Sequence, residues 1–360
     1  MSKTSPRLPA DDQLFFRKAA FFKLLLFLSV IYNHALNYDV YPLHSYGTGG
    51  EVLYGIEKFM LYVSGLSNPM YYCISGFAFF NNYHPSQTLD KWRRRLFTLF
   101  IPWILWNTIM WGMAIAMESI PAIASRLNAG FGYELSLHSW FFDALMDSAD
   151  GPMWFMLNLI VAVLVSPLLY YVLKNRYVGL AAIAGAMAVV HFANVGRYSP
   201  FMTTIYYAEA AWMCMHAKDL VLLNYTKKER VIAGIIVALY FVFGRSPTVQ
   251  GGGLSHVICF TIVSPAMWVA VGNAKLGKKV KAFDKHRFWV YSAHFLPLEC
   301  VEKLWLILAG YTLWAAWLDF FLAPVVISII LIGLSLALKK ICYPIWCLLN
   351  GKKPVRAPVK

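Results

Sequence analysis

The first apolar segment of the chain reads AAFFKLLLFLSVIYNHALNY over residues 19–38. Its length matches the roughly 20 residues that an α-helix needs to cross the hydrocarbon core of a bilayer. Two ionisable side chains interrupt the apolar run, Lys23 and His34. Their spacing is about three helical turns, so a helix places both on one face, roughly 16 Å apart along its axis. The segment therefore predicts a membrane helix that carries a cation and an imidazole on the same side.

Ionisable groups are costly inside a membrane, which makes Lys23 and His34 candidate functional residues. A structural alternative exists, in which neighbouring helices satisfy His34 and Lys23 extends its ammonium group to the interface. If the N-terminus is cytoplasmic, Lys23 lies near the cytoplasmic face and His34 lies deeper, towards the outer half of the membrane.

The composition defines the class of protein. Hydrophobic residues make up 59% of the 360 residues and charged residues 14%, against about 25% charged in soluble domains. We predict an all-α, polytopic membrane protein with about ten transmembrane helices and no sizeable soluble domain. The predicted helices are 19–38, 56–80, 96–117, 153–173, 178–194, 201–217, 231–244, 254–273, 288–309 and 313–338.

The net charge of +14 is explained by its distribution along the chain. Basic residues concentrate in alternate loops, whereas the longest loop, 118–152, is acidic. This alternation follows the positive-inside rule and places both termini in the cytoplasm. We expect a cytoplasmic segment over 1–18 and a basic cytoplasmic tail over 339–360. The charge therefore indicates a lipid bilayer as partner and requires no nucleic acid.

A basic cluster precedes the third predicted helix. It reads Lys91-Trp92-Arg93-Arg94-Arg95 and is followed by Pro102. Several cations at the cytoplasmic mouth of a helix suit a polyanionic ligand, because arginine matches phosphate oxygens with paired donors. The alternative is a topology anchor that contacts anionic lipid.

Two more ionisable residues lie in predicted membrane helices. His294 shares a helix face with Tyr291 and Glu302, and it either assists catalysis or braces helices. Glu209 either orients a catalytic histidine, neutralises an arginine or makes a structural contact between helices. The six cysteines show no spacing typical of disulfides or of a metal site. No metal ligand set is predicted.

Two short segments have structural interpretations. Ser75-Gly76, within Ile74-Ser75-Gly76-Phe77, favours close packing of helices, because small residues let backbones approach. Gly151-Pro152-Met153-Trp154-Phe155 begins the fourth predicted helix, where a tryptophan suits the membrane interface.

Taken in order, these residues resemble acyltransferase family 3, the bacterial inner-membrane acyltransferases that modify surface polysaccharides. The most specific match is the basic residue followed, after ten residues, by histidine, here Lys23 and His34. Ile74 to Phe77, the arginines before Pro102, Trp154-Phe155, and Tyr291 with His294 follow in the family's order. The resemblance implies an acyltransferase domain over about 19–338, in a multi-pass protein of the bacterial cytoplasmic membrane.

The resemblance also implies the reaction. The family is thought to move an acyl group, usually acetyl, from cytoplasmic acyl-CoA to a hydroxyl of an extracytoplasmic or lipid-linked glycan. By this resemblance Lys23, Arg93, Arg94 and Arg95 would hold CoA, and His34 would act at the thioester as general base or as acyl carrier. His294 and Glu209 are the other candidate catalytic residues.

One feature departs from the family's pattern. Two arginines three residues apart commonly lead into the proline of the third helix. Counting back from Pro102 places one at Arg95 and the other at Thr98, which carries no charge. Either the pair has shifted to Lys91 and Arg94, or Thr98 has replaced a cation.

A function of a different class is a transporter of a glycan or lipid intermediate. In such a protein His34, Glu209 and His294 would form a proton relay. No inverted repeat supports this alternative in the sequence.

Overall fold

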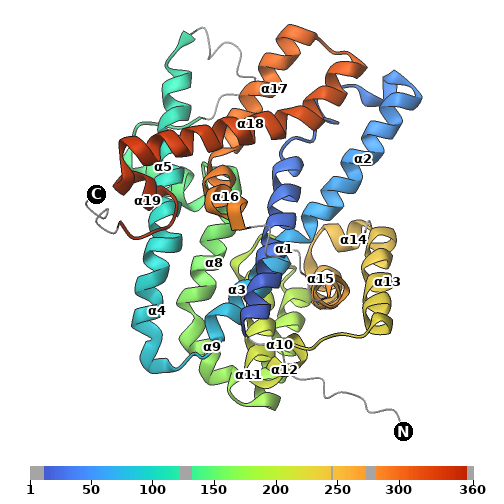
Figure 1. Cartoon of the computed structure of the whole chain (residues 1–360), viewed down its shortest axis with the longest axis vertical. Helices are drawn as coiled ribbons and strands as arrows, with labels where there is room; N and C mark the ends of the chain where they lie inside the picture. Colours follow the sequence, from blue (N-terminus) through green and yellow to red (C-terminus); the bar gives the residue numbers. More distant parts are fainter. Residues whose placement is uncertain (1–11, 122–131, 245, 273–280, 355–360) are drawn as a thin grey trace. The chain divides into compact units, whose positions relative to one another are not determined.

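The computed structural model describes residues 12–121, 132–244, 246–272 and 281–354 (Figure 1), and every regular element in these ranges is helical. The all-α prediction is confirmed for this part of the chain. The predicted terminal segments, 1–18 and 339–360, lie partly outside the described residues. The chain divides into two compact units. Unit 1 contains Met1–Val30, Lys58–Leu89 and Val161–Lys285, and unit 2 contains Ile31–Glu57, Asp90–Ile160 and His286–Lys360.

Unit 1 is built mainly from the middle third of the chain. Its helices are α1 (Asp12–Asn33, up to Val30), the end of α2 (Thr48–Gly65), α3 (Ser67–Phe80), η2 (Pro85–Gln87), α9 (Ser166–Leu173), α10 (Arg176–Phe192), α11 (Pro200–His216), α12 (Lys218–Val221), α13 (Lys227–Phe243), α14 (Pro247–Gln250) and α15 (Gly253–Val271). Leu66 separates α2 from α3, so the single predicted helix 56–80 is two helices.

The closest helix pair in unit 1 is α3 with α11. A Cβ atom on Gly76 would collide with the backbone carbonyl of Tyr207, so only glycine permits this approach. The Tyr207 hydroxyl lies 3.1 Å from the Ser166 hydroxyl of α9. The packing role predicted for Ser75-Gly76 is therefore confirmed at Gly76.

Unit 2 combines the segment after α1 with two later parts of the chain. Its helices are η1 (Leu43–Tyr46), the start of α2, α4 (Thr88–Arg95), η3 (Leu96–Phe100), α5 (Ile101–Glu118), α7 (Leu137–Ser139), η4 (Trp140–Met146), η5 (Gly151–Met153), the start of α8 (Trp154–Leu164), α16 (Lys281–Ala293, from His286), α17 (Phe295–Ala309), α18 (Leu313–Ile341) and α19 (Tyr343–Leu349). The predicted helix 288–309 is thus broken between α16 and α17.

Two contacts order the C-terminal half of unit 2. Gly310 ends α17 with a φ of 67°, and the Thr312 hydroxyl accepts a hydrogen bond from the N–H of Ala315 at the start of α18. This tight turn pairs α17 with α18 (Figure 1). Further along, the Trp106 indole of α5 donates a hydrogen bond to the carbonyl of Leu349 at 3.0 Å, which attaches α19 to α5.

Several helices have the length and composition of membrane spans. Within the described ranges, Pro85–Glu118, Gly253–Val271 and Leu313–Ile341 are long and apolar enough to cross a bilayer. A fourth span results if Gly151–Leu164 and Ser166–Leu173, which meet at an angle of 54°, are counted together. The membrane class agrees with these helices, whereas the number ten and the orientation of the termini stay predictions.

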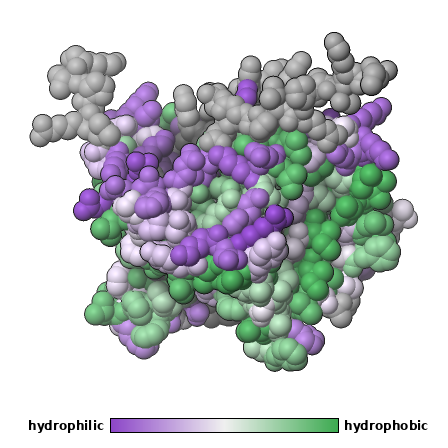
Figure 2. Space-filling view, turned by 90° about the horizontal axis from the view of Figure 1, so that it is seen from below, coloured by the Kyte–Doolittle hydropathy of each residue, from purple (hydrophilic) through white to green (hydrophobic). Residues whose placement is uncertain are grey.

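Large apolar side chains are exposed along several helices. On α18 they include Val325, Val326, Ile329, Ile330 and Leu334. Figure 2 shows broad hydrophobic areas beside polar ones on one face. Exposed apolar patches of this kind are rare on soluble monomers and are expected where helices face lipid.

Candidate active site

His34 lies immediately beyond the end of α1, because the helix ends at Asn33. After the helix end, two backbone N–H groups of the chain donate hydrogen bonds to a side chain instead of to helix carbonyls. The Glu57 carboxylate accepts hydrogen bonds from the N–H groups of Asn37 at 3.0 Å and Tyr38 at 2.8 Å. The Asn37 side chain donates to the carbonyl of Ala316 at 3.0 Å. The predicted helix 19–38 therefore ends early, and His34 is presented on a fixed turn.

His294 lies at the break between α16 and α17. Pro297 explains the break, since it has no N–H to offer the carbonyl of Ala293 four residues earlier. The His294 side chain is fully buried. Its Nδ1 lies 2.7 Å from the carbonyl oxygen of Tyr291. A carbonyl only accepts hydrogen bonds, so Nδ1 carries the proton and Nε2 of a neutral ring is an acceptor.

The structure brings the two candidate histidines together within unit 2. The ring centroids of His34 and His294 are 5.2 Å apart, with an interplanar angle of 61°. Phe295 lies on the same side, with its ring centroid 5.3 Å from that of His34. Two imidazole rings from distant parts of the sequence thus lie next to each other.

The Gly151-Pro152 segment packs against the residues on either side of His294. The Tyr291 hydroxyl donates a hydrogen bond to the Pro152 carbonyl at 2.7 Å. A Cβ atom on Gly151 would lie 3.2 Å from the Phe295 ring, closer than most side-chain contacts. The sequence suggested only an interface role for this segment. Its backbone in fact contacts Tyr291 of α16 and Phe295 of α17, on either side of His294.

Asp150, directly before this segment, was not predicted from the sequence. Its side chain is fully buried, and its N–H donates to the Asn107 side-chain oxygen of α5 at 3.1 Å. Neither carboxyl oxygen has a hydrogen-bond partner among the described residues. Burial raises the pKa of the Asp150 carboxyl well above its ordinary value of 3.8, which favours the protonated, hydrogen-bond-donating form.

Asp150 belongs to a wider set of buried polar atoms in unit 2. Within the part of the chain that the structure describes, the atoms of this set without a hydrogen-bond partner in the protein include Asn37 Oδ1, Tyr41 Oη, Tyr46 Oη, Trp103 Nε1, Ser148 Oγ, both Asp150 carboxyl oxygens, Trp289 Nε1, Ser292 Oγ, His294 Nε2 and Asn350 Oδ1. Such groups are rare in folded proteins because each costs free energy. Three of them, on Trp289, Ser292 and His294, lie together on or next to the end of α16, as expected of a site that binds a polar ligand.

The state of Asp150 has a measurable consequence. Above pH 3.8 the folded state keeps a proton that the unfolded chain releases, so wild-type stability should fall as the pH rises towards the folded-state pKa. Asp150→Asn cannot ionise and should escape this loss, which is about 1.4 kcal/mol per unit of pKa shift. We expect melting temperatures of the two proteins to converge near pH 3.8 and to diverge above it, with the variant higher. Parallel profiles in detergent would contradict this assignment.

The predicted cation cluster lies in the last turn of α4. Arg93 and Arg94 are exposed and Arg95 is partly exposed, and Arg93 reaches Asp90 at only 4.0 Å. The next turn, Leu96–Phe100, is a π-helix in which the N–H of Ile101 bonds to the carbonyl of Leu96. Pro102 leaves the Thr98 carbonyl without an α-helical N–H, which favours this wider turn. The cations therefore stand directly before a local widening of the helix.

Lys23 and Glu209 belong to unit 1. The Lys23 carbonyl accepts a hydrogen bond from the Tyr71 hydroxyl at 2.7 Å. Glu209 Oε1 accepts a hydrogen bond from the Thr261 hydroxyl at 2.6 Å, which joins α11 to α15. This bond supports the structural alternative for Glu209. Its catalytic role stays a prediction.

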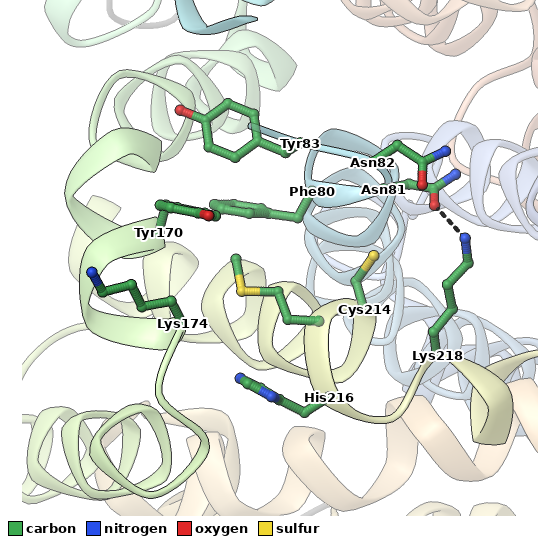
Figure 3. A pocket seen from close by; sticks show the side chains of 10 residues that line it. Phe80, Asn81, Asn82, Tyr83, Tyr170, Lys174, Cys214, His216 and Lys218 are labelled. Carbon is green, nitrogen blue, oxygen red and sulfur yellow. Dashed lines mark hydrogen bonds between the residues drawn. The ribbon is translucent and has the colours of Figure 1, made fainter. Parts of the chain in front are cut away.

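A polar cavity of about 310 Å³ lies at helix ends of unit 1 (Figure 3). The Lys218 ammonium group donates to the Asn81 side chain, beyond the end of α3, at 2.7 Å. The His216 ring donates from Nε2 to the carbonyl of Leu173, the last residue of α9, at 2.7 Å. Basic groups commonly satisfy helix C-termini in this way. His216 thus satisfies the end of α9, and Lys218 is paired with the Asn81 side chain.

The fold and the histidine pair define a helical membrane-type protein with a candidate acid–base or nucleophilic site. The chain matches the family model described as an acyltransferase domain over residues 20–338 and belongs to this family, acyltransferase family 3. The resemblance drawn from the sequence is confirmed, and the protein is an acyltransferase. No curated protein and no solved structure matches the chain.

Proposed function

We propose that the protein transfers an acyl group, in the simplest case acetyl, from cytoplasmic acyl-CoA to a hydroxyl of an extracytoplasmic or lipid-linked glycan. The observation that carries the proposal is the His34–His294 pair, in a chain of the acyltransferase family. The centroids of the two imidazole rings are 5.2 Å apart. Acyl transfer to a hydroxyl needs a group that removes a proton or accepts the acyl group, and imidazole performs both tasks.

In the first route His34 acts as general base. It removes the proton of the acceptor hydroxyl, the resulting oxygen attacks the thioester carbonyl, and the carbon–sulfur bond breaks. The CoA thiolate then takes up the proton from the imidazolium of His34. His294 Nε2, an acceptor without a partner in the described chain, orients the first histidine or stabilises its charged form.

In the second route His34 acts as nucleophile. Its ring nitrogen attacks the thioester and the carbon–sulfur bond breaks. The CoA thiolate takes the proton from the other ring nitrogen of His34, so that CoA leaves as the thiol and a neutral acyl-imidazole remains. When the glycan hydroxyl attacks the acyl carbon, His294 receives the hydroxyl proton and passes it to His34, which leaves as neutral imidazole. Asp150 in its neutral form carries an O–H that can donate to a ligand oxygen in either route.

The donor-binding residues of the proposal are Lys23, Arg93, Arg94 and Arg95. Arginine pairs with phosphate oxygens through two parallel hydrogen bonds, and CoA carries several phosphates. Exposed arginines in the last turn of α4 are accessible to a soluble polyanion. The positive-inside distribution supports a cytoplasmic position for this turn and ten helices in the inner membrane of a bacterium.

The test is acetyl transfer in membranes that contain the protein. Labelled acetyl-CoA should transfer its label to a glycan or lipid-linked saccharide fraction, and membranes without the protein should not show this transfer. Absence of label above that control, with the protein present and folded, would refute the proposed reaction.

The arginine assignment predicts a defect in donor affinity. Arg94→Ala combined with Arg95→Ala should raise KM for acetyl-CoA about tenfold, since each lost contact at an exposed site contributes about 0.7 kcal/mol. kcat should change little, because the substituted side chains bind the donor away from the reacting atoms.

A matched control removes two exposed lysines, Lys227 and Lys228, at the start of α13. This variant loses the same charge from the same predicted side of the membrane, and its KM should stay at the wild-type value. Equal effects in both double variants would mean that general membrane charge, rather than the α4 arginines, attracts the donor.

A further inference from the structure

The C-terminal segment of unit 2 lies against α5 and against the π-helical turn η3, which follows the arginine cluster of α4. The Trp106 indole donates to the carbonyl of Leu349, the last residue of α19, at 3.0 Å. The segment then continues through Asn350, which is almost completely buried. A Cβ atom on Gly351 would lie 3.0 Å from the Thr98 carbonyl. The chain end is thus attached to the π-helical turn that follows Arg95 (Figure 1).

Glycine is required at this attachment point. Gly351 has a φ of 64°, a conformation that other residues adopt at a cost. The N–H of the next residue, Lys352, bonds to the carbonyl of Cys347 at 2.8 Å, as expected where a helix ends in a left-handed residue. The direction of the following residues is therefore set by the end of α19.

The attachment brings Lys353 to the turn that follows the arginine cluster, and Lys352 precedes it in the chain. The Lys353 ammonium group lies 5.2 Å from the centre of the Phe97 ring, and that of Lys352 lies 4.3 Å from the Trp346 ring. Phe97 follows Arg93 by four residues and Arg94 by three, so these side chains share one helix face. Lys353 consequently lies on the face that presents the two exposed arginines.

The resulting surface is strongly basic. The Asp90 carboxylate lies 4.0 Å from the Arg93 guanidinium group. The sequence from Lys339 to Lys360 contains no Asp or Glu. Gathering like charges costs free energy. A ligand with several phosphates offsets this cost, and lysine and arginine are the side chains that bind phosphate.

We infer that Lys352 and Lys353 form, with Arg93 and Arg94, one phosphate-binding surface for the nucleotide end of the acyl donor. The inference rests on the proposed function, which supplies acyl-CoA as donor. It makes this segment a part of the donor site rather than a topology anchor, and it uses side chains 258 to 260 residues apart in the sequence. Lys353 thereby supplies a cation at Phe97, the residue before the uncharged Thr98.

The experiment compares full-length wild type with Lys352→Gln plus Lys353→Gln. KM for acetyl-CoA should rise about five- to tenfold, since two exposed ionic contacts are lost, and kcat should stay within about twofold. Inhibition by adenosine 3′,5′-bisphosphate should weaken by the same factor. With acetyl-pantetheine, a donor without the nucleotide, the variant should equal wild type. Lys227→Gln plus Lys228→Gln is the matched control.

Each outcome bears on the inference. An unchanged KM in a variant that melts like wild type would overturn it, while transfer that still depends on His34 would leave the proposed function intact. No transfer by wild type would instead refute the proposed function. In vesicles of phosphatidylcholine with or without phosphatidylglycerol, the donor defect should persist in both. A defect confined to phosphatidylglycerol vesicles would assign the lysines to lipid phosphate and also overturn the inference.

Discussion

Replacing His34 with alanine is expected to lower kcat for acetyl transfer about 10³-fold. A positioned acid–base or nucleophilic group contributes about 10²- to 10⁴-fold to an enzymatic rate, and no second imidazole can take the same position on the turn after α1. KM for acetyl-CoA should change little, since the donor phosphates are assigned to cations of other segments. Labelled acetyl transfer in membranes measures both constants.

His44→Ala is the matched control for this prediction. His44 is exposed and pairs with Glu51 at 2.7 Å. It is close in sequence to His34 but does not belong to the His34–His294 pair. The control should retain wild-type transfer. If His34→Ala also retained it in protein of normal abundance, His34 could be neither base nor acyl carrier, and the proposed mechanism would be wrong.

The sequence predicts the all-helical fold class well, because apolar segments of about 20 residues are long enough to cross a membrane as helices. The predicted third helix, 96–117, corresponds to η3 and α5 over Leu96–Glu118, and the predicted last helix, 313–338, to α18 over Leu313–Ile341. The misplaced boundaries have local causes. Pro297 breaks the predicted helix 288–309, and the Glu57 carboxylate takes the N–H groups that would have extended α1 beyond His34.

The candidate site was only partly predictable. His34 and His294 are visible in the sequence because ionisable residues in apolar segments are unusual. Asp150 lies in an acidic loop with Asp143 and Asp147, and its sequence neighbours do not distinguish a buried carboxyl from an exposed one. Only the bond to Asn107 and the contacts of Gly151 and Pro152 reveal that it is interior.

The contact of the C-terminal segment with η3 and α5 was equally hidden from the sequence. Lys352 and Lys353 belong to a basic tail that the positive-inside rule already explains. No pattern in the sequence connects them with Arg93. A long-range contact of this kind follows from how Trp106 and Gly351 pack, which no local pattern encodes.

Replacing His294 with phenylalanine is expected to lower kcat about 10²-fold while the protein keeps its fold. Phenylalanine preserves the ring and nearly the volume of a fully buried side chain, and it removes both nitrogens. It deletes the bond to the Tyr291 carbonyl, 2.7 Å long, and the Nε2 acceptor in the ring beside His34. A bracing role requires only the ring, whereas proton acceptance requires Nε2. Wild-type transfer by a normally melting His294→Phe would therefore assign His294 to packing, and a selective loss of kcat would assign it to the chemistry.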